Sequence, residues 1–135
     1  MKFRKMMGVT AAFLCVALAL SGCGSTDETA YRIGIVQQDE HSSLDAATQG
    51  FEDKLMELLG EENVTFDYQN AQGEQANSTT IATKFVSDGC DLILANGTTA
   101  LQSAAAATAD IPIVGTSVTD YIAAGAVNSN EKPGT

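Results

Sequence analysis

The feature that most constrains the fold is an alternation of apolar strand and amphipathic helix, which begins in residues 31–59. Residues 31–36 are mostly apolar, residues 37–43 are polar, and the following segment carries apolar residues every three or four positions. These apolar residues are Leu44, Ala47, Phe51, Leu55, Leu58 and Leu59. That spacing places them on one face of an α-helix, and Gly60 follows as a helix terminator. The stretch therefore predicts a buried strand, a polar loop and a helix that packs against the strand.

The rest of the chain repeats this plan. Residues 64–69 alternate apolar and polar side chains, which is typical of a strand with one face in solvent, whereas residues 91–95 and 111–114 are nearly continuous apolar runs. We therefore expect the first of these strands at an edge and the other two in the centre of a sheet. Helical patterns lie between them, in residues 74–87 and 98–108, and a short helix is expected in residues 120–126. Regular alternation of this kind favours right-handed βαβ units and a parallel sheet.

The first 22 residues have the pattern of an export signal. Lys2, Arg4 and Lys5 form a positive head, residues 6–20 are mostly apolar, and small residues follow before Cys23. Residues 20–23 (Leu-Ser-Gly-Cys) resemble the lipobox of bacterial lipoproteins, which implies cleavage before Cys23 and a diacylglycerol on its sulfur. The alternative is an ordinary signal in which this cysteine is coincidental. Residues 23–30 are small and polar and are expected to form a flexible tether.

Charge and cysteine content narrow the classes of partner and site. Beyond the signal, the chain keeps four basic residues (Arg32, Lys54, Lys84, Lys132) against all 17 acidic ones, a formal net charge of −13. A surface with this much negative charge repels phosphate backbones, which argues against nucleic-acid binding. Cys90 would be the one free cysteine, because Cys15 leaves with the signal and Cys23 is the proposed lipid site. A single thiol cannot form an internal disulfide or a cysteine-based zinc site. We interpret Cys90 as a small, partly buried apolar residue.

Three polar loops are the candidate site, because each follows a predicted strand on the same edge of the sheet. They are residues 37–43, 96–99 and 115–120. Open α/β sheets bind ligands at the carboxyl ends of their strands. Thr98 is expected to cap the helix that follows it, which leaves amides of the first turn free for a ligand carboxylate. Alternatively, these side chains serve only as turn and cap formers.

His41 is the single histidine, and it could act as a base, a metal ligand or a hydrogen-bond partner. Without a second histidine or a nearby cysteine it makes a poor metal site. A catalytic triad can be drawn from His41, Asp120 and either Ser42 or Ser117, but no Gly-x-Ser-x-Gly elbow accompanies it. Glycine-rich phosphate loops are also absent from the sequence. These observations argue against an enzyme and imply no cofactor.

An ordered set of short motifs resembles a known family. The motifs are IGIVQ (33–37), EH (40–41), LDAA (44–47), GF (50–51), NAQGE (70–74), DLILA (91–95), DIPIV (110–114) and VTD (118–120). Together they are similar to the amino-terminal half of substrate-binding lipoproteins of ABC importers of the tryptophan/tyrosine type. The resemblance implies one lobe, residues 31–135, of a type I periplasmic binding protein, in which two α/β lobes close on a ligand. It implies a three-layer α/β sandwich with strand order 2-1-3-4, and a fifth strand and second lobe beyond Thr135.

The resemblance also implies a site and a role. The residues expected to line this lobe's side of the cleft are Gln37, His41, Ser42, Ser43, Asn96, Thr98, Thr99, Thr116, Ser117 and Asp120. Family ligands are commonly aromatic amino acids, whose ammonium group needs a carboxylate such as that of Asp120. The chain departs from the family pattern at residues 98–101, where Thr-Pro-Ala-Ala is common, and at Tyr121, where proline is common.

The implied protein is lipid-anchored outside the cytoplasmic membrane of a bacterium and delivers its solute to an ABC permease. Two alternatives remain at this point. One is an extracytoplasmic ligand sensor that feeds a membrane signalling protein. The other is an exported hydrolase that uses His41.

Overall fold

The computed structural model describes residues 30–133, so the predicted signal, Cys23 and most of the predicted tether lie outside the described residues. Strands and helices alternate along the chain, with one short 3₁₀ turn. In order they are β1 (Tyr31–Gln37), α1 (Ser42–Leu59), η1 (Glu61–Asn63), β2 (Val64–Asn70), α2 (Gln75–Ser87), β3 (Leu92–Asn96), α3 (Thr98–Ala107) and β4 (Ile113–Thr116).

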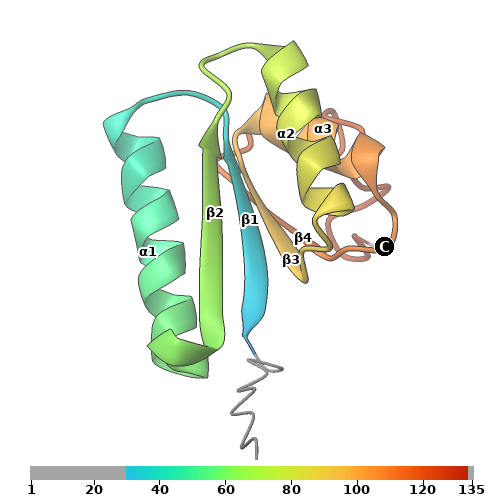
Figure 1. The fold of residues 1–135 in the computed structure, drawn as a ribbon. Coiled ribbons are helices and arrows are strands. Elements are labelled where there is room, and N and C mark those ends of the chain that lie inside the picture. The colour runs from blue at the N-terminus through green and yellow to red at the C-terminus, as the bar shows by residue number, and fades with distance from the viewer. Residues whose placement is uncertain (1–29, 134–135) are drawn as a thin grey trace, which may run out of the picture.

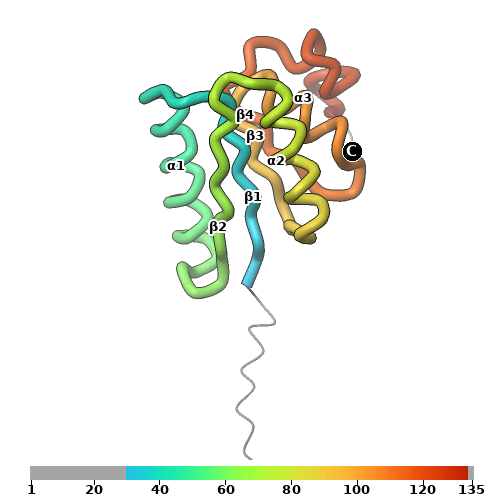
Figure 2. Tube along the Cα trace, turned by 45° about the horizontal axis from the view of Figure 1, so that its top comes forward, coloured from blue at the N-terminus to red at the C-terminus, as the bar shows by residue number. Residues whose placement is uncertain are grey.

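The four strands form one parallel sheet in the order β2-β1-β3-β4, which confirms the predicted order. Helix α1 covers one face of the sheet, and α2 and α3 cover the other (Figure 1). The tube view shows the same three layers, with the loops that follow the strands gathered at one end (Figure 2). The chain therefore forms the three-layer α/β sandwich expected from its sequence.

Strand β4 begins two residues later than the apolar run 111–114, after Pro112, and lies at an edge of the described sheet. A central place was expected for this run together with a fifth strand beyond Thr135, and that expectation stays a prediction. Ile111 and Ile113 pack against the core on the α3 side, whereas Val114 on the other face is 41% exposed. An apolar run reports burial of side chains and carries no direct information on how many neighbouring strands the backbone has.

Two apolar clusters hold the layers together, one on each face of the sheet. On the α1 face, Ile33, Ile35 and Leu94 pack with side chains of α1 such as Phe51 and Leu55. On the other face, the fully buried Phe85 of α2 packs in a cluster with residues of α3 and of β1 and β3; the buried members of this cluster are Val36, Phe85, Cys90, Ile93, Ala95, Ala100, Leu101 and Ala104. Cys90 is 5% exposed and free, as the sequence suggested, and burial raises the pKa of its thiol.

One leucine of helix α1 lies outside the buried face expected from the apolar spacing. Leu58 is 65% exposed, so its assignment to the apolar face is wrong, and Met56 packs against the sheet cluster instead. The one buried residue of α1 is Thr48. Its hydroxyl is hydrogen-bonded to two buried side chains at the ends of β1 and β3, which turns this side of the helix toward the sheet. Gly60 ends the helix with a φ of 89°, a conformation that favours glycine.

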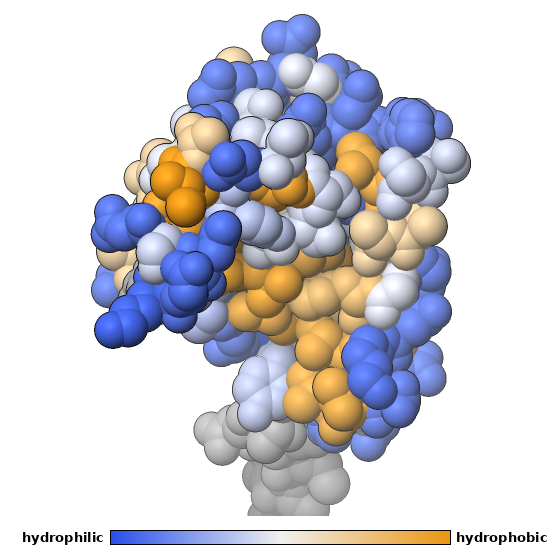
Figure 3. All heavy atoms as spheres, turned by 180° about the vertical axis from the view of Figure 1, so that it is seen from behind, coloured by the Kyte–Doolittle hydropathy of each residue, from blue (hydrophilic) through white to orange (hydrophobic). Residues whose placement is uncertain are grey.

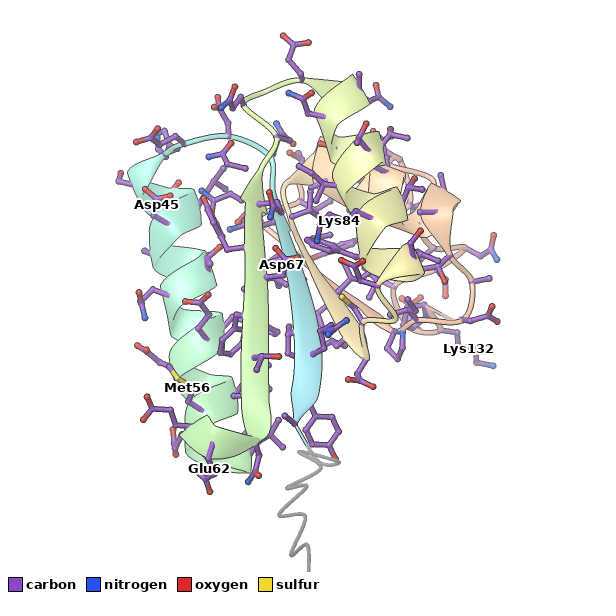
Figure 4. All side chains as sticks on the ribbon, viewed as in Figure 1. Asp45, Met56, Glu62, Asp67, Lys84 and Lys132 are labelled. Atoms are coloured by element: carbon purple, nitrogen blue, oxygen red, sulfur yellow. The ribbon has the colours of Figure 1, made fainter. Side chains whose placement is uncertain are left out.

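Charged groups tie α2 to the edge strand on the side away from α1. Lys84 pairs with Asp67 of β2 at 2.5 Å and with Asp88 at 2.6 Å, and Figure 4 shows the labelled Lys84 and Asp67 side chains close together. The hydrogen bond from Lys84 lowers the pKa of Asp67.

Viewed from behind, the molecule shows a continuous area of apolar side chains bordered by polar ones (Figure 3). No helix in residues 30–133 has the length and apolarity needed to cross a membrane.

Candidate functional site

The carboxyl ends of the four strands are aligned in one row. In the sheet register Asn70 lies opposite Gln37, Gln37 opposite Asn96, and Asn96 opposite Thr116. Because parallel strands all end at this edge, the loops that follow them form a common rim. The structure thus brings together the three loops that the sequence singled out, and it adds the loop after β2. In Figure 4, Asp45 marks this rim end of α1, and Glu62 marks the opposite end of the molecule.

Gln37 and Asn96 lie beneath the rim with fully buried side chains. Gln37 Nε2 donates to the Asp39 carbonyl at 2.8 Å and to Asp45 Oδ1 at 2.7 Å. Asn96 Nδ2 donates to the Leu44 carbonyl at 2.8 Å. These bonds join β1 and β3 to the start of α1, and the expectation that the two side chains line the cleft stays a prediction.

Thr48 completes this buried network, and the sequence analysis missed it. Its hydroxyl donates to Gln37 Oε1 at 2.8 Å and lies 3.0 Å from Asn96 Nδ2, from which it accepts. The signal that could have found it is its position, one residue after Ala47 within the apolar face of the helix. Asn96 Oδ1 is buried and has no hydrogen-bond partner among the described residues.

His41 caps the helix that follows it. It is the N-cap of α1, where its Nδ1 accepts from the Ser43 backbone amide at 3.2 Å and lies 2.8 Å from Ser43 Oγ. Ser42 and Ser43 form the exposed first turn of α1. The side chain of His41 thereby satisfies one of the amides that a helix start leaves free.

The cap role of His41 can be tested by substitution. We expect His41→Ala to lower the free energy of unfolding by about 1 kcal/mol, because Ala cannot accept from the Ser43 amide. Asn is a good N-cap residue, so His41→Asn should retain most of that stability. Urea unfolding of both variants measures the difference. Equal losses in the two variants would contradict a cap role.

Helix α3 is capped differently from the expectation. The N-cap is Gly97, so Thr98 does not cap the helix but forms its first residue. The amide of Thr99 is occupied by the side chain of Gln38, whose Oε1 accepts from it at 2.9 Å. Gln38, and not Thr98, therefore supplies a side-chain acceptor at the start of α3. No local sequence pattern connects Gln38 with Thr99, because the two residues belong to different loops.

The loop after β4 folds back on itself. Asp120 Oδ1 accepts from the amides of Ile122 and Ala123, at 2.9 and 3.0 Å, and residues 121–125 form turns where a helix was expected. The Tyr121 hydroxyl donates to the Gly115 carbonyl at 2.9 Å. Ser117 has a φ of 57° and, like Asp120, is exposed. One oxygen of Asp120 thus shapes its own loop while the carboxylate stays accessible at the rim.

The described residues place no metal-type cluster at the rim. Within residues 30–133, His, Cys, Asp and Glu side chains nowhere gather in groups of three or more that could hold a metal ion.

A cavity of about 210 Å³ lies beside the buried network, between α1 and β2, and is lined by Gln37, Asp45, Thr48, Gln49, Glu52 and Tyr68. Burial, with a smaller contribution from Asp53, raises the pKa of Glu52 on its wall.

Comparison with known proteins gives a consistent result. The family model described as ABC transporter substrate binding protein matches residues 32–135. A curated relative, the tyrosine-binding protein of Clostridioides difficile, is 40% identical over an alignment of 149 residues that covers 98% of this chain and 43% of the relative.

Two solved structures share the fold and much of the sequence. The first is the ligand-free, open structure of a substrate-binding protein with adhesive properties from Clostridium difficile; it is 47% identical, with a TM-score of 0.75. The second, from Streptococcus pneumonia, is described as an ABC domain in complex with L-Trp; it is 35% identical, with a TM-score of 0.74. Each match covers 78% of this chain and 36% of the solved chain, so the chain spans less than half the length of these relatives.

Proposed function

Because the chain belongs to the ABC transporter substrate-binding protein family, we propose that it is the amino-terminal lobe of an extracytoplasmic, lipid-anchored binder of aromatic amino acids. Its lipid would be carried by Cys23, its ligand would lie against the rim, and its partner would be an ABC permease. The observation that carries the proposal is the register that aligns Gln37, Asn96 and Thr116, because it gathers three polar loops at one sheet edge.

The chemistry of the rim suits an amino acid. Asp120 supplies an exposed carboxylate for the ligand's ammonium group, and the other groups at the rim are hydroxyls and amides that can hold its carboxylate. The exposed or partly exposed hydroxyl residues are Ser42, Ser43, Thr98, Thr99, Thr116 and Ser117. In this proposal Gln37 and Asn96 act from below, by holding the loops in place, and His41 acts at the rim beside Ser43. The names of the relatives, which refer to tyrosine and L-Trp, support an aromatic side chain.

The hydrolase alternative loses support from the hydrogen bonds of its candidate residues. His41 Nδ1 is engaged with Ser43, and Asp120 Oδ1 accepts from two amides of its own turn. A Ser-His-Asp triad instead needs the aspartate on a ring nitrogen of the histidine.

The chain itself should bind its ligand weakly. Relatives are more than twice its length, and a second lobe would supply the remaining polar contacts and the closure that excludes water. We expect nuclear magnetic resonance titration of the chain with L-tryptophan to give a dissociation constant of about millimolar or weaker. Shifts should be confined to residues 38–43, 97–99 and 116–120.

Two results would overturn parts of this proposal. Low-micromolar binding measured by calorimetry would show that one lobe is sufficient. Shifts confined to the opposite end of the sheet would remove the rim as the site. For the anchor, a Cys23→Ala chain expressed in a bacterium should leave the membrane fraction, and its retention there would contradict lipidation.

A further inference from the structure

Gln38 lies in the loop that follows β1 and makes hydrogen bonds to residues that follow or end two other strands. Its amide donates at 2.9 Å to the carbonyl of Asn96, the last residue of β3, and its side-chain Oε1 accepts at 2.9 Å from the amide of Thr99, in the first turn of α3. Two bonds therefore connect it to the junction between β3 and α3. Its carbonyl accepts from the Gly73 amide at 2.8 Å, in the loop after β2. This one residue therefore links the loops that follow β1, β2 and β3.

The loop after β3 is shaped to receive this side chain. Gly97 has a φ of 116°, and a Cβ at that position would lie 2.6 Å from Gln38 Cβ and 2.7 Å from its Oε1. Only glycine permits both the backbone conformation and so close an approach. The side chain of Gln38 is partly buried in this contact.

The Gln38 side chain is uncharged, and this matters for a ligand as well as its position does. The rim already carries several exposed acids, among them Asp39, Glu40 and Asp120. The acceptor that reaches Thr99 is a neutral amide oxygen, so it satisfies the amide without adding a further negative charge. A carboxylate in the same place would repel an anionic group of a ligand.

We propose that Gln38 is the positioning residue of the rim: it fixes three β-to-α loops relative to one another, and its neutrality admits ligands that carry a carboxylate. The second half of this statement rests on the proposed amino-acid site. The first half concerns the free protein and can be tested without a ligand.

The ligand-free test uses Gln38→Met in the full chain, with Gln75→Met as the matched control. Methionine keeps the length of the side chain and removes the acceptor. Gln75 lies in the first turn of α2, is exposed, and makes no side-chain hydrogen bond recorded within residues 30–133. Gln38→Met should speed hydrogen exchange of the Thr99 amide about tenfold. It should also shift the Gly73 amide resonance, because Gly73 bonds to the Gln38 carbonyl in another loop.

A change confined to Thr99 and its sequence neighbours would overturn the positioning role and leave only a local cap. Equal changes in the Gln75→Met control would overturn it as well. Both outcomes are read from the free protein, so they do not depend on whether amino acids bind.

The ligand test uses Gln38→Glu, which keeps the acceptor and adds a charge, with Gln75→Glu as the control for charge. The probes are L-tryptophan and tryptamine, which differ by the carboxylate. Gln38→Glu should weaken binding of L-tryptophan about fivefold or more and leave tryptamine binding equal or tighter. The melting temperature should not fall, because a carboxylate is also an acceptor and suits a helix start.

Equal weakening of both probes, or of neither, would overturn the neutrality claim. If the unsubstituted chain binds neither probe, the proposed amino-acid site fails together with this claim. The exchange result in Gln38→Met would then still decide the positioning role by itself.

Discussion

Replacing Gly34 by alanine is expected to lower the free energy of unfolding by about 1–3 kcal/mol. Gly34 lies in β1 beneath α2, where an added Cβ would lie 2.6 Å from two atoms of the Phe85 ring. Phe85 is fully buried, so its ring cannot move aside without disturbing the core. The effect should appear as a lower urea midpoint with an unchanged slope.

Gly50 provides the matched control for this substitution. It lies in α1, is exposed, and an added Cβ would meet no atom within 4 Å. Gly50→Ala should therefore stabilise the chain, by about 0.5–1 kcal/mol, because glycine is a poor helix former. Combining Gly34→Ala with Phe85→Leu should recover part of the lost stability. If Gly34→Ala unfolds at the same midpoint as the unsubstituted chain, the close packing of β1 and α2 is wrong.

Replacing Thr48 by valine is the second substitution with a large expected effect. Valine has nearly the shape of threonine but removes the hydroxyl that donates to Gln37 Oε1 and accepts from Asn96 Nδ2. Thr48 is 6% exposed, so water cannot readily replace these bonds. Leaving buried partners unsatisfied costs about 1–3 kcal/mol, and the free energy of unfolding should fall by that amount.

Thr83 offers the comparison for Thr48. It is an exposed helical threonine whose hydroxyl donates to the Thr79 carbonyl in its own helix. Thr83→Val should change the stability by less than about 0.5 kcal/mol. A loss for Thr48→Val that is no larger than this would mean that the network beneath the rim contributes little to holding α1 on the sheet.

The sequence predicted the order of helices and strands along the chain because this order follows from long periodic segments. Apolar runs and helical spacing in residues 31–114 locate strands and helices, and alternation of the two restricts the topology to parallel crossovers. The family resemblance supplied the order of the strands. The position of three loops at one edge then follows, since parallel strands end together.

The contacts that were missed connect residues far apart in the chain. Gln38 and Thr99 are separated by 61 positions, and Thr48 and Asn96 by 48, so no local pattern reveals either pair. The bonds of Thr48 also explain the wrong assignment of Leu58. They hold the Thr48 side of α1 against the sheet, and Leu58 lies on a different side of the helix. Asp120 failed as a helix start because its carboxylate closes a turn that does not propagate.

Strand β1 also sets how the protein would stand on a lipid surface. Its seven residues run roughly 23 Å from the segment that leads back to Cys23 to the rim. The described residues begin at Ala30, next to the end of β1 that lies opposite the rim, so a lipid on Cys23, as proposed, would be attached on that side. On the proposed anchor, this geometry would turn the rim away from the membrane when β1 stands upright on it.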